Sequence, residues 1–187
     1  MKKELILVIK QSILPAIRNM KDFEKVISSQ YEYMILLDSH ITQIKSVVAT
    51  AKKHNKKILI HMDMIDGLKN DESGTLFVCQ EIKPAGIIST KRQAIITAKK
   101  KGVLAIQRLF SIDTLALENG LELLKNTKPD YIEVLPGIIP EIIREVHKKT
   151  DIKIIAGGLV REKSEIESAL KSGAISVSTS NRDLWEL

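Results

Sequence analysis

The sequence predicts an α/β protein built as a compact, single-domain (β/α)8 barrel of the TIM type with short loops. Three observations predict it. Short apolar runs alternate about eight times with helix-period stretches, at a spacing of about 23 residues, as in a parallel sheet with crossover helices. The composition is 44% hydrophobic but only 4% aromatic, as buried aliphatic strands require. No low-complexity linker divides the 187 residues, so one domain, 1–187, is expected.

Eight short apolar runs are the expected strands. In chain order they are Leu14–Ile17, Tyr33–Leu37, Ile58–His61, Gly86–Ile88, Val103–Gln107, Tyr131–Val134, Ile152–Ala156 and Ala174–Val177. Eight repeats fit a closed barrel, in which the loops after the strands form the functional face. An open, doubly wound sheet is the alternative. It is disfavoured because no G-x-G-x-x-G motif follows the first run.

Amphipathic stretches between these runs are the expected helices. The clearest are Ile44–Lys53, Arg92–Lys100, Glu141–Lys149 and Lys163–Lys171. Glycines at 102 and 173 stand just past two of them, where glycine commonly ends a helix. Residues 1–10 are expected to form a short helix that caps the barrel floor. Residues 66–82 are expected to be irregular, with 70–74 as the most flexible stretch.

Charge and cysteine content narrow the functional classes. The net charge of +6 permits an anionic partner, but lysine-rich helix surfaces give the same balance. The one cysteine, Cys79, excludes an internal disulfide and a zinc site made of cysteines alone. The apolar run Leu5–Val8 is too short for a signal peptide, and no run approaches the roughly 20 residues of a membrane span. The cytoplasm is therefore the expected compartment.

Two segments near the C-terminus predict an anion site. The last two strands end in Gly157-Gly158 and in Ser178-Thr179-Ser180. Glycines let backbone N–H groups approach a ligand, and the hydroxyls precede an expected short last helix, Asn181–Trp185, whose N-terminus would favour negative charge. In (β/α)8 barrels, the loops after strands 7 and 8 often hold a phosphate. We therefore expect the barrel to bind a small phosphorylated molecule.

Further polar residues end the other strands. Arg18 and Arg108 offer forked donors to phosphate or carboxylate, or form surface salt bridges. Glu133 lies within an apolar run, where a buried carboxylate needs a partner, and we expect a ligand hydroxyl or an arginine. Ser89 follows the fourth run, Gly86–Ile88, and is also a candidate ligand residue. Strand ends are also where polar residues reach the surface, which is the simpler explanation for each of them alone.

Two mirrored pairs, Asp38-x-His40 and His61-x-Asp63, follow adjacent strands. Two histidines and two acids could bind a divalent metal. A metal site of the kind seen in pentose-phosphate epimerases would want another acid at the end of strand seven, where this chain has Ala156-Gly157-Gly158. We therefore predict no metal, and expect His61 and Asp63 to form hydrogen bonds, with ligand contact included.

Lysines cluster at the predicted helix C-termini. The candidates for an RNA-binding floor are Lys52, Lys53, Lys56, Lys57, Lys99, Lys100, Lys101, Lys148 and Lys149. Cations are favoured at helix C-termini in any protein, so these clusters also have a purely structural explanation. A basic surface that follows a nucleic-acid backbone is the alternative. No zinc finger, helix-turn-helix or aromatic RNA-binding signature supports it independently.

The motifs, taken in order, resemble those of the glycerol-3-phosphate-responsive antiterminators of bacteria. The matching segments, which span nearly the whole chain, are Pro15–Arg18, His61–Leu68, Gly86–Thr90, Ile106–Phe110, Ile132–Gly137, Ile155–Leu159 and Ser178–Ser180. Met64 stands where the family more usually has Leu, and Thr114 where it has Ser. Neither departure weakens the resemblance.

The resemblance implies a regulator rather than an enzyme. Such proteins are small barrels that sense glycerol 3-phosphate, need no cofactor and act on the leader mRNA of glycerol-catabolic operons. Polymerase then reads past a terminator and the message is stabilised. A phosphosugar epimerase, isomerase or phosphodiesterase is the alternative, as is a metabolite-binding protein that acts through another protein. The oligomeric state stays open, with a homo-oligomer among the arrangements allowed.

Overall fold

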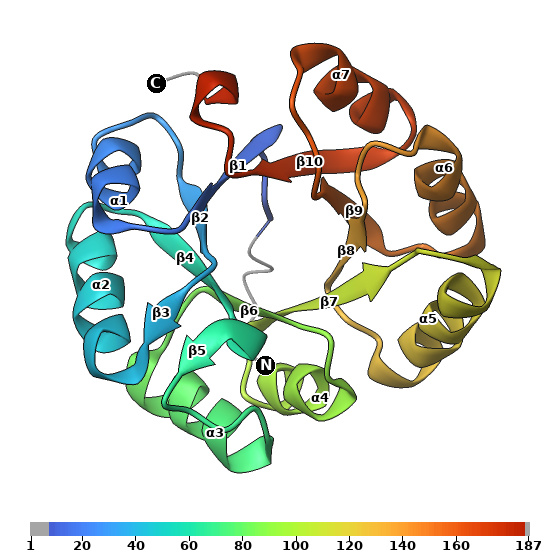
Figure 1. Cartoon of the computed structure of the whole chain (residues 1–187). Coiled ribbons are helices and arrows are strands. Elements are labelled where there is room, and N and C mark those ends of the chain that lie inside the picture. Colours follow the sequence, from blue (N-terminus) through green and yellow to red (C-terminus); the bar gives the residue numbers. More distant parts are fainter. Residues whose placement is uncertain (1–7, 186–187) are drawn as a thin grey trace.

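The computed structural model describes residues 8–185, which form a closed barrel of eight parallel strands inside a ring of helices (Figure 1). Neighbouring strands around the barrel are β1 (Ile13–Ile17), β2 (Tyr33–Leu36), β4 (Lys57–His61), β6 (Gly86–Ser89), β7 (Leu104–Phe110), β8 (Tyr131–Leu135), β9 (Lys153–Gly157) and β10 (Ala174–Thr179). Strand β10 pairs with β1 and closes the ring. The (β/α)8 prediction is confirmed, and the open-sheet alternative is excluded.

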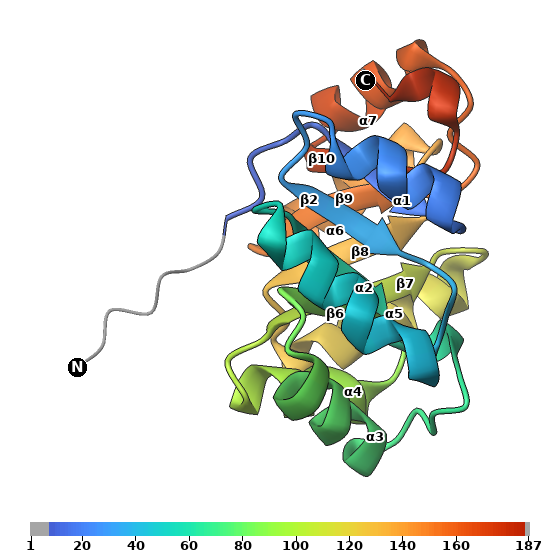
Figure 2. The same cartoon turned by 90° about the vertical axis from the view of Figure 1, so that its left-hand side faces the viewer.

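Seven α-helices lie in the described part of the chain, outside the strands. They are α1 (Met20–Ile27), α2 (Ile41–Lys53), α3 (Glu72–Phe77), α4 (Arg92–Lys100), α5 (Thr114–Thr127), α6 (Pro140–Lys149) and α7 (Lys163–Lys171). From the side, α1 and α2 lie against the outer surface of the barrel (Figure 2). The bounds of α4 and α7 are those expected from the sequence. Their ends coincide with strong helix stop signals, which explains the agreement.

The apolar residues separate into two cores because side chains alternate between the two faces of each strand. One cluster fills the barrel. Its buried members come from seven of the strands, among them Leu14, Tyr33, Leu59, Ile106 and Ile155, and the partly buried Ile175 of β10 packs against it. The larger cluster lies between the strands and the surrounding helices. This alternation decides which polar residues at the strand ends face the barrel interior.

The expectation for residues 66–82 is wrong. The segment contains helix α3 and a π-helix, Val78–Ile82, and a small two-stranded sheet, β3 (Ser39–His40) with β5 (Ile65–Asp66), lies at its start. Asp71 caps α3 by accepting a hydrogen bond from the Gly74 N–H at 2.9 Å. Burial of Val78 and Cys79 then holds the segment against the barrel. Six-residue elements are too short to show a helical period, so sequence pattern does not reveal them.

The N-terminal helix is also not observed where the structure describes the chain. Residues 8–10 have no helical structure, and the rest of the predicted cap, residues 1–7, lies outside the described residues. Ile9 is buried at the barrel floor, and its N–H donates to the Tyr131 hydroxyl at 3.1 Å. Within the described residues, the floor is thus covered in part by a segment without regular secondary structure.

Candidate ligand-binding site

The two segments that suggested an anion site lie side by side. Strands β9 and β10 pair in parallel, with Gly157 opposite Ser178. The loops beyond them enclose a cavity of about 150 Å³. It is lined by Ala16, Arg18, Leu37, Arg108, Glu133, Gly158, Leu159, Val160, Ser178, Thr179 and Ser180. Seven of the eleven predicted ligand residues therefore line one cavity, and Gly157 lies directly beside it.

Glycine is favoured at positions 157 and 158 for two different physical reasons. A Cβ on Gly157 would lie 2.3 Å from Ser178 Oγ and 3.1 Å from Glu133 Oε1, so glycine there makes room for these two side chains. Gly158 has φ of +80°, a backbone conformation that glycine adopts without strain. Only Gly158 lines the cavity. Gly157 therefore contributes to the site through packing.

Two of the three predicted hydroxyls are already used within the protein. Ser178 Oγ donates to Glu133 Oε1 at 2.8 Å, and Thr179 Oγ1 accepts from the Asn181 N–H at 3.1 Å. Ser180 is exposed and is free of such contacts with the described residues. The expected last helix is only a three-residue 3-10 turn, Arg182–Leu184, so it supplies little helix dipole. An anion here would depend on loop N–H groups, Ser180 and the arginines.

The charge of the cavity comes from a buried ion pair and one further arginine. Arg108 Nε lies 2.7 Å from Glu133 Oε2, and the two side chains are 10% and 2% exposed. Glu133 thus has an arginine partner, one of the two kinds of partner that its sequence context predicted. Two guanidinium groups face the cavity against one carboxylate, so the lining keeps a net positive charge. Because Arg108 binds Glu133 through Nε, its two Nη groups remain to meet an anion.

Arg18 is held less tightly. Its Nη1 lies 3.0 Å from Asp38 Oδ2, and the side chains are 56% and 44% exposed. Arg18 also borders a second hollow of about 140 Å³ between α1 and α2. An exposed pair of this kind contributes little to stability, so Arg18 can turn toward a ligand at small cost.

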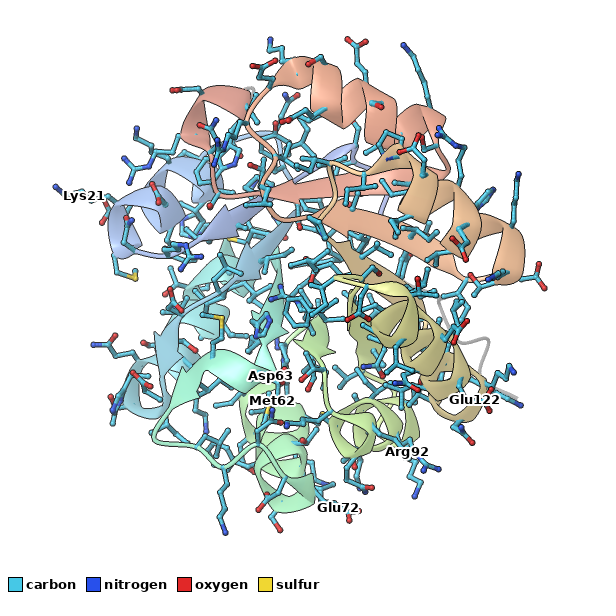
Figure 3. The ribbon with its side chains drawn as sticks, turned by 45° about the vertical axis from the view of Figure 1, so that its right-hand side comes forward. Lys21, Met62, Asp63, Glu72, Arg92 and Glu122 are labelled. Carbon is cyan, nitrogen blue, oxygen red and sulfur yellow. The ribbon has the colours of Figure 1, made fainter. Side chains whose placement is uncertain are left out.

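Asp63 lies on the opposite side of the barrel mouth, and both of its carboxylate oxygens accept hydrogen bonds. Its Oδ2 accepts from the Thr90 N–H at 2.8 Å and from Thr90 Oγ1 at 2.7 Å, and its Oδ1 accepts from Asn70 Nδ2 at 2.6 Å and from Ser89 Oγ. Burial alone would raise the pKa of this carboxyl, but the four hydrogen bonds outweigh burial and lower it. Figure 3 shows Asp63 inside the ring of helices, whereas Lys21, Glu72 and Glu122 project outward. In this structure, Asp63 and Ser89 join the 62–70 segment to the end of β6.

His61 ends β4 and is 3% exposed. Neither ring nitrogen has a hydrogen-bond partner among the described residues. The pKa of His61 is lowered, first by burial and then by the positive charge of Arg108, against the opposing effects of Asp63 and Glu133. The imidazole is therefore neutral near pH 7.

The mirrored Asp-His and His-Asp pairs do not form a metal site in the described part of the chain. Asp38 pairs with Arg18, and His40 Nδ1 caps α2 by accepting from the Thr42 N–H at 3.3 Å. Among residues 8–185, no group of three or more His, Cys, Asp or Glu side chains is arranged to hold a metal ion. Asp38 thus forms a salt bridge, His40 caps a helix, and Asp63 holds neighbouring loop residues through its hydrogen bonds.

The nine lysines of the predicted floor lie at the amino-terminal end of the barrel, opposite the cavity. Five of them are tied to protein groups: Lys52 to the Lys83 carbonyl, Lys56 to the Ser29 and Tyr31 carbonyls, Lys57 to Glu32, Lys99 to Asp130 and Lys149 to Glu145. The other four, Lys53, Lys100, Lys101 and Lys148, are exposed and have no such partner within residues 8–185. Only these four are free to contact an external anion without breaking an internal contact.

The fold and the site define a small (β/α)8 barrel with a positively charged cavity at the carboxyl ends of its last two strands. Within the described residues, no helix is long and apolar enough to cross a membrane. A sequence model described as "Glycerol-3-phosphate responsive antiterminator" matches residues 13–185. The chain belongs to this family, as its motifs suggested.

Solved structures agree with this assignment. A glycerol uptake operon antiterminator regulatory protein from Listeria monocytogenes str. 4b F2365 is 47% identical, with a TM-score of 0.92, over 94% of this chain and 95% of that one. A glycerol uptake operon antiterminator-related protein from Thermotoga maritima MSB8 is 31% identical, with a TM-score of 0.84, over 95% and 99%. Among curated sequences, the uncharacterized protein YgcP of Escherichia coli K12 is 30% identical over 94% of this chain and 92% of its own.

Proposed function

We propose that this protein is a cytoplasmic regulator that binds glycerol 3-phosphate and then acts on the leader mRNA of glycerol-catabolic operons. It promotes read-through of a terminator and stabilises the transcript, and it needs neither a cofactor nor catalysis. The observation that carries the proposal is the linked row of side chains Arg108, Glu133 and Ser178 in the wall of the β9–β10 cavity. The protein that contains it belongs to this family.

The phosphate would lie at the β9–β10 side of the mouth. Gly158 and Ser180 present backbone and hydroxyl there, and Arg108 adds charge through its free Nη groups. Glu133 does not oppose the anion strongly because Arg108 neutralises it at 2.7 Å. Glu133 also keeps the guanidinium fixed, so little ordering is required when the phosphate binds.

The RNA would contact the opposite end of the barrel. In the predicted floor, the exposed cations that have no partner among residues 8–185 are Lys53, Lys100, Lys101 and Lys148. RNA backbones bind such groups with a strong salt dependence. Because mouth and floor lie at opposite ends, the effector must change the population of an RNA-competent state. It can do so only by binding that state more tightly than the other.

The enzyme alternative has less support. An epimerase or phosphodiesterase would need a free acid–base group or a metal at the mouth. Asp63 already accepts four hydrogen bonds, and Glu133 is held by Arg108 and Ser178. His61 has no hydrogen-bond partner among the described residues, but both carboxylates whose charges act on it are already committed. The mouth is therefore better suited to holding a ligand than to a proton transfer that needs paired acid and base groups.

Titration calorimetry with glycerol 3-phosphate and with inorganic phosphate tests the effector site. We expect saturable binding of glycerol 3-phosphate at one site per chain, and a much weaker response to phosphate. Ser180→Ala should weaken binding severalfold, whereas Ser164→Ala, on exposed α7, is the matched control and should not. Absence of glycerol 3-phosphate binding to the wild type would contradict the proposal.

Gel-shift titration with glycerol-operon leader RNA, with and without glycerol 3-phosphate, tests the output. The triple variant Lys53→Gln, Lys100→Gln, Lys101→Gln should bind RNA more weakly and reduce the slope of log affinity against log salt by up to about 2. The matched control changes three exposed lysines at the other end, Lys21, Lys69 and Lys163, to Gln. If only the control variant loses RNA affinity, the RNA surface lies at the mouth.

A further inference from the structure

His61 is a buried hydrogen-bonding group for which the protein itself provides no partner. Its strand places it inside the barrel: Leu59, two residues earlier on β4, belongs to the core that fills the barrel, and alternation puts His61 on the same face. The ring is 3% exposed, and neither Nδ1 nor Nε2 meets a partner among the described residues. Buried polar atoms are rarely left unpaired, because each lost hydrogen bond costs free energy.

The neighbouring charged groups form no hydrogen bond with the imidazole among the described residues. Asp63, two residues along the chain, uses both oxygens on Asn70, Ser89 and Thr90. Glu133 is held by Arg108 and Ser178 on the far side of the mouth. Arg108 is close enough for its charge to act on His61, and it also lines the β9–β10 cavity. Ile106, two residues before Arg108 on β7, belongs to the same core as Leu59, so alternation places Arg108 and His61 both on the interior face of the barrel.

We propose that His61 recognises a hydroxyl group of the effector, so that the site selects phosphorylated polyols over phosphate esters without hydroxyls. The inference rests on the proposed function, since it adds a specificity-determining residue to the same site. A neutral imidazole has one N–H donor and one acceptor nitrogen. A hydroxyl can satisfy either of them, because it both donates and accepts.

The surrounding charges restrict the ligand group further. The positive charge of Arg108 and the negative charges of Asp63 and Glu133 all act on His61. A ligand carboxylate placed there would meet two negative charges and only one positive charge, which already neutralises Glu133. A neutral hydroxyl avoids this repulsion. The phosphate end, by contrast, has the net positive lining of the β9–β10 cavity.

Calorimetric comparison of glycerol 3-phosphate with n-propyl phosphate tests this assignment. The two esters have the same charge and carbon chain, and only the first has hydroxyls. The wild type should prefer glycerol 3-phosphate by at least about tenfold, the effect of one neutral hydrogen bond. His61→Leu should lose that preference by about tenfold while still binding propyl phosphate. His61→Gln, which keeps one donor and one acceptor, should retain part of it.

His54→Gln is the matched control, because His54 is an exposed histidine at the floor and should leave the preference unchanged. If His61→Leu does not fold, NMR of 15N-labelled histidine in the wild type supplies the same test. Glycerol 3-phosphate should shift the His61 ring signals, which are assigned by their absence in His61→Gln, and propyl phosphate should not.

The outcomes separate the two proposals. Equal wild-type affinity for the two esters, an unchanged preference in the His61 variants, or equal ring shifts with both esters would overturn the role of His61. Each of these results would leave the phosphate site intact. If neither ester binds to the wild type, both this assignment and the proposed effector site are contradicted.

Discussion

Two carboxylates on opposite sides of the barrel mouth are held in different ways: Asp63 is half-buried and Glu133 is buried. Asp63 is held by four neutral donors, which come from Asn70, Ser89 and Thr90. Glu133 is held by the charged Arg108 and by Ser178, and it lines a cavity. The first arrangement gives the carboxylate four hydrogen-bond donors, whereas the second leaves the Nη groups of an arginine beside a cavity.

The difference is the one expected between a carboxylate that fixes the local chain and one that borders a cavity. A carboxylate surrounded by fixed backbone and hydroxyl donors stabilises the local chain conformation and has little left for a ligand. A carboxylate paired with arginine positions a cation, and the pair can accept an anion without leaving a buried charge uncompensated. The following predictions test whether the Asp63 side and the Glu133 side behave in these two ways.

The largest effect is expected at the buried pair. Arg108→Met leaves Glu133 buried without its cation, so the free energy of unfolding should fall by about 3–5 kcal/mol. Glycerol 3-phosphate binding should be lost as well. Urea denaturation and calorimetry measure the two effects. A loss of stability below about 1 kcal/mol would show that the pair is no more consequential than a surface pair.

Asp63→Asn should reduce the free energy of unfolding by about 2 kcal/mol. The amide oxygen is a weaker acceptor than a carboxylate oxygen, and the amide NH2 group would face donors that now point at Asp63. The folded-state pKa of Asp63 is lowered, so its stabilisation is present above the unfolded-state value of 3.8 and disappears as pH falls through the folded-state pKa. Urea denaturation at pH 7 and in this acidic range should show a flatter profile for Asp63→Asn. A profile parallel to that of the wild type would contradict this stabilising role of Asp63.

A smaller, pH-dependent effect is expected at His61. Its folded-state pKa lies below the unfolded-state value of 6.5, so the unfolded chain takes up a proton that the folded chain does not. Stability should therefore fall as pH decreases from about 6.5 toward the folded-state pKa. Comparing urea denaturation at pH 7.5 and 5.5, His61→Gln should show less of this loss than the wild type. The exposed His54→Gln should behave like the wild type.

The smallest effect on stability is expected for Arg18→Met. The Arg18–Asp38 pair is half exposed, so its removal should change the free energy of unfolding by less than about 1 kcal/mol. Glycerol 3-phosphate affinity should still decrease severalfold, because Arg18 lines the cavity. An effect on stability as large as that of Arg108→Met would remove the distinction between the two arginines.

Pattern along the chain was sufficient for the barrel and for the end at which the β9–β10 cavity lies. Alternating strand and helix periods, with Gly102 and Gly173 past two helices, are local signals, and they predicted α4 and α7 to the residue. Parallel strands bring all their carboxyl ends to one face, so the polar residues at those ends had to meet there. The small sheet, α3 and the π-helix gave no such signal because they are too short to show a period.

Which donor meets which acceptor was decided only by folding. In the sequence, Asp63 and Glu133 are equivalent candidates, each following or lying within an apolar strand. Their partners come from other strands: Ser89 lies 26 residues from Asp63, and Ser178 lies 45 residues from Glu133. Closure of the barrel sets these pairings through strand register, and register depends on how all eight strands pack together. The periodicity of any one strand does not contain that information.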